Sequence, residues 1–416
     1  MSIYSSFYSA LSGLSANGSA MSVIGNNLAN LNTIGYKGSS ATFQDLFSSA
    51  MGSSAVQGNG NPNQIGMGSS LASISQNFAS GSTQSTGNVT DMAIQGDGFF
   101  ALQTQAGTRA YTRAGNFTLD VNSNLVNSSG YNVMGWLRAG TPPSVNTSLT
   151  AAPINLSAYQ AISATPTQNV GFTTNLDAGA AVNGTFTSSI DIYDSLGNAH
   201  TVQLTYTKTA SNEWDVSATV ADAATVYNSG TTNAWTSHLT FDSDGNLDTA
   251  AATTVNHQMD LTWSNGSAAQ TLTFDQSYMT QSATASQTSA STQDGMAAGT
   301  LEGLSVSNDG EIIGQFSNGQ NVVIAQVALA MFTNTNGLQK AGSNCWTETI
   351  ASGSANIATA NAGGRGYIQG SSLELSNVDT ATELTQMIVT QQGYQANSRV
   401  ITTANTLLQE VLNLIR

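Results

Sequence analysis

Amphipathic patterns at the two ends of the 416-residue chain constrain its fold more than any other feature. Near the start, apolar residues recur every three or four positions; near the end they recur every seven, as in a coiled-coil seam. We therefore predict paired terminal helices at 1–33 and 374–416. The apolar residues predicted to form their assembly faces are Phe7, Leu14, Met21, Ile24, Leu28, Leu384, Met387, Tyr394, Ile401, Leu408, Val411 and Ile415.

Each predicted helix needs more than one neighbour. The apolar stripe between Leu407 and Ile415 is so wide that one partner helix cannot bury it. In the N-terminal helix, Gly13, Gly18 and Gly25 each cost about 1 kcal/mol relative to alanine. We expect both helices to be unstable alone and to become ordered in an assembly.

The N-terminal helix runs into the segment N-N-L-A-N-L-N-T-I-G-Y-K-G at residues 26–38. A helix C-terminus explains part of it, because Gly35 can adopt a left-handed conformation and Lys37 would suit the negative end of the helix dipole. Capping does not explain so many asparagines. Since buried amides need partners, we predict contacts with neighbouring chains. These residues are Asn26, Asn27, Asn30 and Asn32.

Between the helices the pattern is that of β-strands. Apolar and polar residues alternate from 92 to 139, and Asn-Gly and Asp-Gly turn signals recur further along the chain. Segments 141–170, 248–256 and 277–293 are predicted to be linkers or irregular loops. The predicted fold class is multidomain α+β, in which mostly antiparallel β domains are nested between paired, coiled-coil-like terminal helices.

The charge of the chain is low in density and acidic in sign. Only 8% of residues are charged, and 24 acids against 9 bases give a net charge of −15. We expect neither nucleic acid nor an anionic membrane surface as a partner, because both are bound through lysine and arginine. Residues 148–291 hold eleven carboxylates and only Lys208 as a base, a net charge of −10. This shift in composition predicts an inserted acidic domain.

The sequence contains few features that indicate a cellular compartment. Cys345 is the one cysteine, so no internal disulfide can form, and no run of apolar residues is long enough to span a bilayer. The first residues lack a cationic region and an apolar core. We therefore expect no cleaved secretory signal and no membrane insertion.

No catalytic, cofactor or metal site is predicted. The histidines have no metal-ligand spacing, the Asp242-Ser-Asp-Gly loop lacks the glycine and glutamate positions of a calcium loop, and no helix follows Gly96-Asp-Gly98 to hold a dinucleotide. Cys345 is expected to be a buried, inert thiol. An alternative class is an exported glycan-binding or glycan-acting protein, which would need paired carboxylates. Its nearest candidates are Asp191, Asp194 and Asp215.

Long motifs in the right order resemble the flagellar rod and hook protein family. Asn26–Lys37 is similar to the N-terminal signature of that family, and Ser372-Leu-Glu-Leu-Ser-Asn-Val-Asp379 with Gln391-Gln-Gly-Tyr-Gln-Ala-Asn397 is similar to its C-terminal one. Between them lie Ala93-Ile-Gln-Gly-Asp-Gly-Phe-Phe100 and Tyr111-Thr-Arg-Ala-Gly-Asn-Phe117. The chain length and the large insertion resemble hook proteins, while a distal rod protein is the nearer alternative. Segment 48–70, rich in Gly, Ser and Asn, looks longer than the usual form in the family, and 141–185 matches weakly.

The resemblance implies a subunit of a curved extracellular tube that joins the rod to the filament and transmits torque while bending. It implies many identical copies, export through the flagellar type III apparatus, and contacts with rod, hook-cap and hook–filament junction proteins. The terminal helices would form the inner tube. The other expected parts are a connecting region at 34–75 and 362–373, a β-rich middle domain at 76–147 and 292–361, and the acidic outer domain at 148–291.

Overall fold

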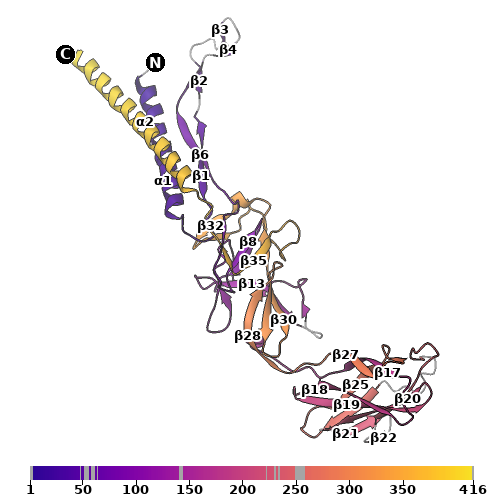
Figure 1. Ribbon diagram of the computed structural model, residues 1–416. Helices are drawn as coiled ribbons and strands as arrows, with labels where there is room; N and C mark the ends of the chain where they lie inside the picture. The colour runs from indigo at the N-terminus through magenta and orange to yellow at the C-terminus, as the bar shows by residue number, and fades with distance from the viewer. Residues whose placement is uncertain are drawn as a thin grey trace. The chain divides into compact units, whose positions relative to one another are not determined.

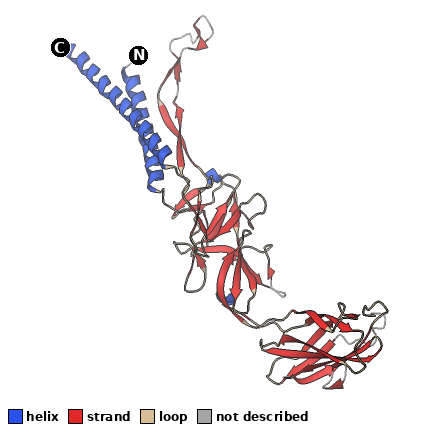
Figure 2. Cartoon of the chain, viewed as in Figure 1, coloured by secondary structure: helices blue, strands red, loops and turns tan. Residues whose placement is uncertain are grey.

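A computed structural model of the chain gives two long helices and many short strands (Figures 1 and 2). It describes residues 3–46, 48–50, 56–57, 61–62, 64–139, 144–221, 223–228, 231–232, 235–248 and 258–414. The chain divides into two compact units. Unit 1 consists of Met1–Ser157, Leu304–Gly314 and Val322–Arg416, and unit 2 of Ala158–Gly303 and Gln315–Asn321.

Helix α1 (Ile3–Ala29) and helix α2 (Thr380–Leu414) lie side by side in unit 1 (Figure 1). They are antiparallel, because Asn27 near the end of α1 bonds Glu383 near the start of α2. Both are shorter than the predicted ranges 1–33 and 374–416. Helix α2 begins at Thr380 because the Asp379 carboxylate accepts the N–H of Thr382 at 2.8 Å, as an N-cap does.

A β-hairpin of unit 1 packs along the helices. Strand β1 (Ser39–Asp45) pairs with β6 (Ser69–Gln76), and both strands contact α1. The Ser69 N–H donates to the Ser12 hydroxyl, which fixes one point of the hairpin on α1. Four further short strands lie between β1 and β6 in the described part of this segment, paired as β2 with β5 and β3 with β4: β2 (Ser48–Ala50), β3 (Val56–Gln57), β4 (Asn61–Pro62) and β5 (Gln64–Gly66).

The other strands of unit 1 bring both halves of the chain together. Strands after the insertion pair with strands before it: β36 with β7, β35 with β8, β31 with β9, β33 with β10 and β30 with β13. The core is aromatic and includes Phe99, Tyr111, Trp136 and Trp346. The strands are β7 (Thr83–Ser85), β8 (Met92–Gln95), β9 (Phe99–Gln103), β10 (Arg109–Thr112), β11 (Thr118–Leu119), β12 (Leu125–Val126), β13 (Asn132–Ala139), β14 (Ser144–Val145), β15 (Ala152–Pro153), β30 (Asn321–Val327), β31 (Leu329–Met331), β32 (Gln339–Gly342), β33 (Cys345–Thr347), β34 (Asn356–Ala358), β35 (Tyr367–Gly370) and β36 (Ser372–Glu374).

Unit 2 contains two sheets that share one apolar core. One sheet has the order β18-β19-β20-β23, and the other has β22-β21-β24-β25-β17-β26 with β27 also paired to β17. Pairing is antiparallel except where β17 meets β25 and β26. The strands are β16 (Ala161–Ile162), β17 (Asn169–Asp177), β18 (Thr185–Tyr193), β19 (Ala199–Ala210), β20 (Glu213–Val220), β21 (Ala223–Asn228), β22 (Thr231–Thr232), β23 (Trp235–Thr240), β24 (Gln258–Trp263), β25 (Gln270–Asp275), β26 (Thr280–Ser282) and β27 (Gln287–Gln293); β28 (Gly299–Val306) and β29 (Glu311–Phe316) have residues in both units.

The prediction of irregular loops is only partly right. Segment 277–293 contains β26 and β27, and β27 pairs with β17 over six registered positions. Segment 141–170 contains the short strands β14, β15 and β16. Residues 249–257 lie outside the described part of the chain, so the prediction for 248–256 is not addressed.

Candidate assembly site

The contact between α1 and α2 is made by small and amide side chains. The buried residues of α1 recur every three or four positions, as one face of a helix does, and most of them lack a large side chain. Such a face allows close approach of two helices but buries little apolar area. The buried residues are Ala10, Gly13, Ala16, Ala20, Ile24 and Asn27.

Two glycine–asparagine contacts fix how these helices meet. A Cβ placed on Gly13 would lie 2.7 Å from Nδ2 of Asn397, and one placed on Gly393 would lie 3.2 Å from Oδ1 of Asn17. Each helix therefore places an asparagine against a glycine of the other. The Asn17 amide also donates to the Gly13 carbonyl oxygen at 2.8 Å. A side chain at Gly13 would force the Asn397 amide to move from this contact, which explains glycine at this helix position despite its low helix propensity.

Most of the predicted assembly residues are not fully buried by this contact. Only Ile24 is fully buried, while Phe7, Leu14, Met21, Leu28, Met387, Ile401 and Leu408 are partly buried. Leu384, Tyr394 and Val411 are 43%, 38% and 45% exposed. Ile415 lies outside the described residues. The pairing of α1 with α2 thus leaves the larger apolar side chains available, and their role in assembly stays a prediction.

Asn27 joins the end of α1 to the first turn of α2. Its amide donates to the Ser39 carbonyl at 2.8 Å and to Oε1 of Glu383 at 3.0 Å, and its oxygen accepts from the Ser39 N–H and the Tyr36 hydroxyl. This buried amide is satisfied within one chain, and the predicted contacts of the signature asparagines with neighbouring chains stay a prediction.

The other signature asparagines are local. Asn26 donates to the Tyr36 hydroxyl, and Asn30 donates back to the carbonyl and side-chain oxygens of Asn26. Asn32 is exposed. Gly35 has a positive φ of 66°, as predicted, and a Cβ there would lie 2.5 Å from the Ala114 nitrogen. Only glycine fits that approach.

Lys37, Arg113 and Glu374 form a fully buried charge cluster in unit 1. The Lys37 ammonium donates to Oε1 of Glu374 at 2.6 Å and to the Ala79 carbonyl at 2.8 Å, and Nη1 of Arg113 lies 3.6 Å from Oε2 of Glu374. The Gly81 N–H also donates to Oε1. Burial lowers the pKa of Lys37, and the Glu374 carboxylate opposes that shift.

This cluster joins three distant segments of sequence. Lys37 follows α1, Arg113 follows β10, and Glu374 ends β36 just before α2. The helix-dipole interpretation of Lys37 is therefore wrong, because its charge is neutralised by Glu374. Sequence reasoning missed Arg113 and Glu374 as partners, although both stand in the quoted family motifs. Because only 8% of residues are charged, the charged residues inside these motifs were the sequence feature that could have predicted the cluster.

Asp191 and Asp215 of unit 2 are too far apart to form a catalytic pair. Asp191 pairs with Thr201 and Asp215 with Thr207, six residues further along β19. They are therefore about 20 Å apart along the strands, beyond the roughly 5 to 10 Å of glycosidase carboxylates. Asp194 is fully buried. Burial alone would raise the pKa of Asp194. Its carboxylate instead accepts hydrogen bonds from Ser267, Asn198, Asn265 and His200, and these hold the pKa of Asp194 well below its usual value.

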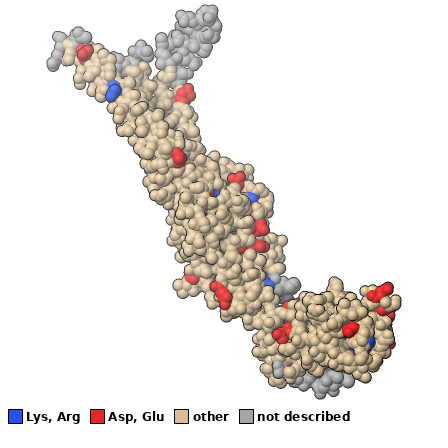
Figure 3. Space-filling model, viewed as in Figure 1, with Lys and Arg blue, Asp and Glu red and all other residues tan. Residues whose placement is uncertain are grey.

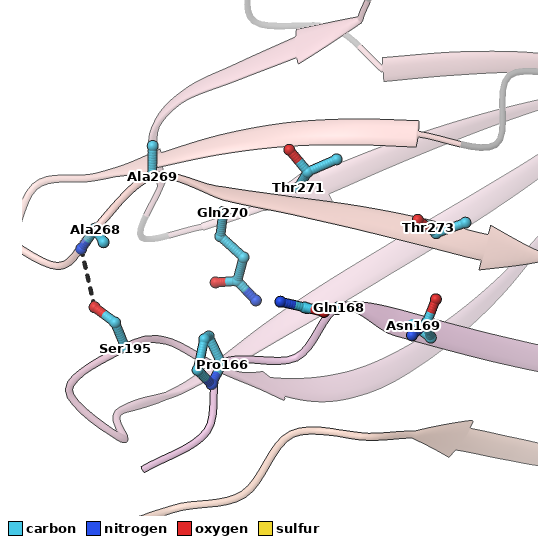
Figure 4. A pocket seen from close by; sticks show the side chains of 9 residues that line it. All are labelled: Pro166, Gln168, Asn169, Ser195, Ala268, Ala269, Gln270, Thr271 and Thr273. Atoms are coloured by element: carbon cyan, nitrogen blue, oxygen red, sulfur yellow. Dashed lines mark hydrogen bonds between the residues drawn. The ribbon is translucent and has the colours of Figure 1, made fainter. Parts of the chain in front are cut away.

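The pocket in Figure 4 offers no acid–base group. This cavity of about 400 Å³ in unit 2 is lined by amide, hydroxyl and small side chains, and the Ser195 hydroxyl accepts the Ala268 N–H across one rim.

Among the described residues no group of three potential metal ligands comes together. Cys345 is buried, and burial raises its pKa to about 11, so its thiol is unreactive near neutral pH. No helix within the described residues is long and apolar enough to cross a bilayer.

Models of known protein families match four segments of the chain. Residues 7–37 match the flagella basal body rod protein model, 93–168 the flagellar hook protein FlgE/F/G D1 domain, 155–296 the flagellar basal body protein FlaE D2 domain, and 369–414 the flagellar basal body rod FlgEFG protein C-terminal model. These models, with the terminal helix pair, define a subunit of the rod-and-hook class.

Relatives that align over the full length of the chain identify the family within that class. The chain is 35% identical to the flagellar hook protein FlgE of Salmonella typhimurium, over 98% of this chain and 100% of the relative. It is also 35% identical to that of Treponema pallidum, with 99% of each covered. A crystal structure of Helicobacter pylori flagellar hook protein FlgE2 shares the fold, with a TM-score of 0.53 at 15% identity over 69% of this chain and 99% of that one. The chain belongs to the flagellar hook protein family, a family of structural proteins and not of enzymes.

Proposed function

We propose that copies of this chain polymerise into the flagellar hook, a curved, flexible tube that transmits torque from rod to filament as a universal joint. The observation that carries the proposal is the helix pair, whose larger apolar side chains face outward in a chain that matches hook proteins over its whole length. An apolar surface of this kind on a long helix needs further neighbours. Identical copies would supply them.

The buried cluster of Lys37, Arg113 and Glu374 supports torque transmission. It ties the first residues after α1 and the last residues before α2 to a strand end of unit 1. Side chains that are buried and paired resist separation, because removing one partner leaves an uncompensated charge. Force on the helix pair would thus reach the β-rich part of unit 1 through a rigid connection.

The four-part division remains part of the proposal. Inner helices at 1–33 and 374–416 would form the inner tube, with a connecting region at 34–75 and 362–373, a middle domain at 76–147 and 292–361, and an acidic outer domain at 148–291. The outer domain has few bases with which to make ion pairs between copies. Its contacts would be polar, wet and weak, so that they re-form as the tube bends.

The remaining partners follow from the same assignment. The subunit would be extracellular, exported through the type III apparatus without a cleaved signal peptide, and would meet rod, hook-cap and hook–filament junction proteins. A distal rod protein is less well supported, since hook proteins align with 98% or more of this chain. The carboxylate arrangement in unit 2 does not support a glycan-acting protein.

The test places a charge on the exposed apolar face that Leu407, Val411 and Leu412 form near the end of α2. Val411 is 45% exposed, so Val411→Asp leaves the isolated chain folded. In a tube, a carboxylate buried against apolar neighbours costs several kcal/mol per copy, and we expect no tubes by electron microscopy. Gln409→Asp, two residues away at an exposed polar position, is the matched control and keeps normal tubes. Normal tubes from Val411→Asp would contradict assembly through this face.

A further inference from the structure

A pocket in unit 1 is lined by one member of the buried charge cluster. The pocket measures about 290 Å³, and its walls are mostly apolar, formed by Phe78, Phe99, Met331 and Phe332. Arg113 is the cation that lines it. This side chain is 1% exposed, and its guanidinium carbon lies 5.4 Å from the centre of the Phe99 ring. The pocket therefore combines apolar walls with one buried positive charge.

The Arg113 guanidinium has hydrogen-bond donors to spare. Its Nε and Nη1 atoms are buried and have no hydrogen-bond partner among the described residues. Oε2 of Glu374 lies 3.6 Å from Nη1, which is too long for a hydrogen bond, and a closer approach of that oxygen would still leave Nε unpaired. Because buried polar groups of folded proteins are nearly always paired, these donors indicate a partner in the pocket, either water or a ligand.

The charges around the pocket favour an anion over water. Lys37 and Arg113 share the one carboxylate of Glu374, so two cations and one anion leave these buried groups with a net charge of +1. Burial lowers the pKa of Arg113, and the carboxylates of Glu374 and Asp97 oppose that shift. Asp97 also lines the pocket, but its side chain is exposed. A bound monoanion would neutralise the buried excess charge, and Asp97 would repel a second negative charge.

We propose that this pocket binds a small monocarboxylate with an apolar body. The planar guanidinium of Arg113 offers donors that match the two oxygens of a carboxylate, and the apolar body would pack against Phe78 and Phe332. Competing sites are few, because the chain has nine lysines and arginines in all and few charged side chains on the surface visible in Figure 3. The pocket lies within unit 1 of a single chain, so the proposal does not depend on polymerisation.

The test titrates benzoate into the unassembled full-length chain and follows binding by isothermal calorimetry. Benzamide, which has the same ring and no charge, is the matched probe. We expect saturable binding of benzoate and roughly tenfold weaker binding of benzamide, because only benzoate neutralises the buried excess charge. Benzoate should also raise the thermal transition of unit 1 and leave that of unit 2 in place, since a ligand stabilises the part of the molecule that binds it.

Two variants locate the site without changing the buried cluster. Asp97→Asn removes the negative charge at the pocket and should tighten benzoate binding several-fold. Ala79→Leu places a larger side chain at an exposed lining position and should abolish binding; the Ala79 carbonyl that accepts from Lys37 is unchanged. The matched control is Ala72→Leu, an exposed position of β6 that does not line the pocket, and it should bind benzoate as the native chain does.

Three outcomes would overturn the proposal. They are equal binding of benzoate and benzamide, benzoate binding that survives Ala79→Leu, and no saturable binding of benzoate, which would leave water as the partner of Arg113. None of them bears on hook assembly, which the tubes formed by Val411→Asp test separately.

Discussion

Unit 2 and the helix pair of unit 1 keep their apolar side chains in opposite places. In unit 2, Trp214, Trp235, Leu239 and Phe274 are at most 1% exposed, inside a core shared by two sheets. In the helix pair, alanines, glycines and amides occupy the contact, and larger apolar residues are on the outside. Burial of apolar area is the main source of stability. We therefore expect unit 2 to fold alone and the helix pair to be completed by other copies.

The largest expected effect is a contrast in amide exchange within the unassembled chain. Exchange protection follows local stability, which is highest in well-buried strands and lowest where few apolar contacts hold a segment. We expect strong protection in β19 and β20 and little or none in α1 and α2. Hydrogen exchange followed by mass spectrometry on monomer and polymer measures it. We expect α1 and α2 to become protected on assembly. Strong protection of α1 and α2 already in the monomer would contradict the expected difference between the helices and the strands of unit 2.

The next effect concerns the buried charges that anchor the helix pair. Glu374→Gln removes the carboxylate that pairs with both Lys37 and Arg113 and leaves these two buried cations without their shared counter-charge. Breaking a buried pair from one side costs about 3 to 5 kcal/mol. We expect the thermal transition of unit 1 to fall by several degrees while that of unit 2 stays in place. Calorimetry of the full chain resolves the two.

The control for that variant is Glu302→Gln, because Glu302 is exposed and its replacement changes the net charge by the same amount. It should leave both transitions unmoved. Equal effects from the two variants would mean that the cluster contributes only through overall charge.

The sequence predicted element types better than it predicted partners. Heptad counting found both helices, but it weighted large apolar residues and therefore could not see that Gly13, Ala16 and Ala20 form the intrachain contact. Segment 277–293 was missed because β27 pairs only with β17 and is largely exposed, so its Ser, Thr and Gln residues show no apolar alternation. Lys37 was misread because its partner Glu374 is far away in sequence, where no local rule can reach it.

Deleting the insertion tests whether the helix pair needs unit 2. Thr165 and Met296 exchange both backbone hydrogen bonds, at 3.0 and 2.9 Å, so a short Gly-Ser turn can join them after removal of 166–295. The deleted segment holds twelve carboxylates and one lysine, a net charge of −11. We expect the shortened chain to form tubes with altered curvature, because an insertion whose ends are adjacent can be removed with little strain.

Varying the salt concentration adds a second measurement to the deletion experiment. Repulsion between acidic copies is screened over about 8 to 10 Å near physiological ionic strength. Tube yield from the full chain should therefore rise with salt, and yield from the deletion variant should depend on salt less. If the variant fails to assemble at every salt concentration, unit 2 supplies contacts that the helix pair cannot replace.

The smallest expected effect is a pH dependence confined to unit 2. Asp194 is buried beside His200, Asn265 and Ser267, and its folded pKa lies below the unfolded value of about 3.9. A group with a lowered folded pKa stabilises the fold above the unfolded pKa and loses that contribution as pH falls toward the folded one. Unit 2 should thus lose stability progressively below about pH 4. Asp194→Asn should make the stability of unit 2 depend less on pH in this range, measured by acid melts followed by Trp fluorescence.

Asp242→Asn is the matched control, since Asp242 accepts the same kind of turn hydrogen bonds from Asp244 and Asn246 but is exposed. Its profile should stay closer to that of the native chain. An unchanged acid profile for Asp194→Asn would show that the carboxylate does not hold unit 2 together, and that the closed core alone does.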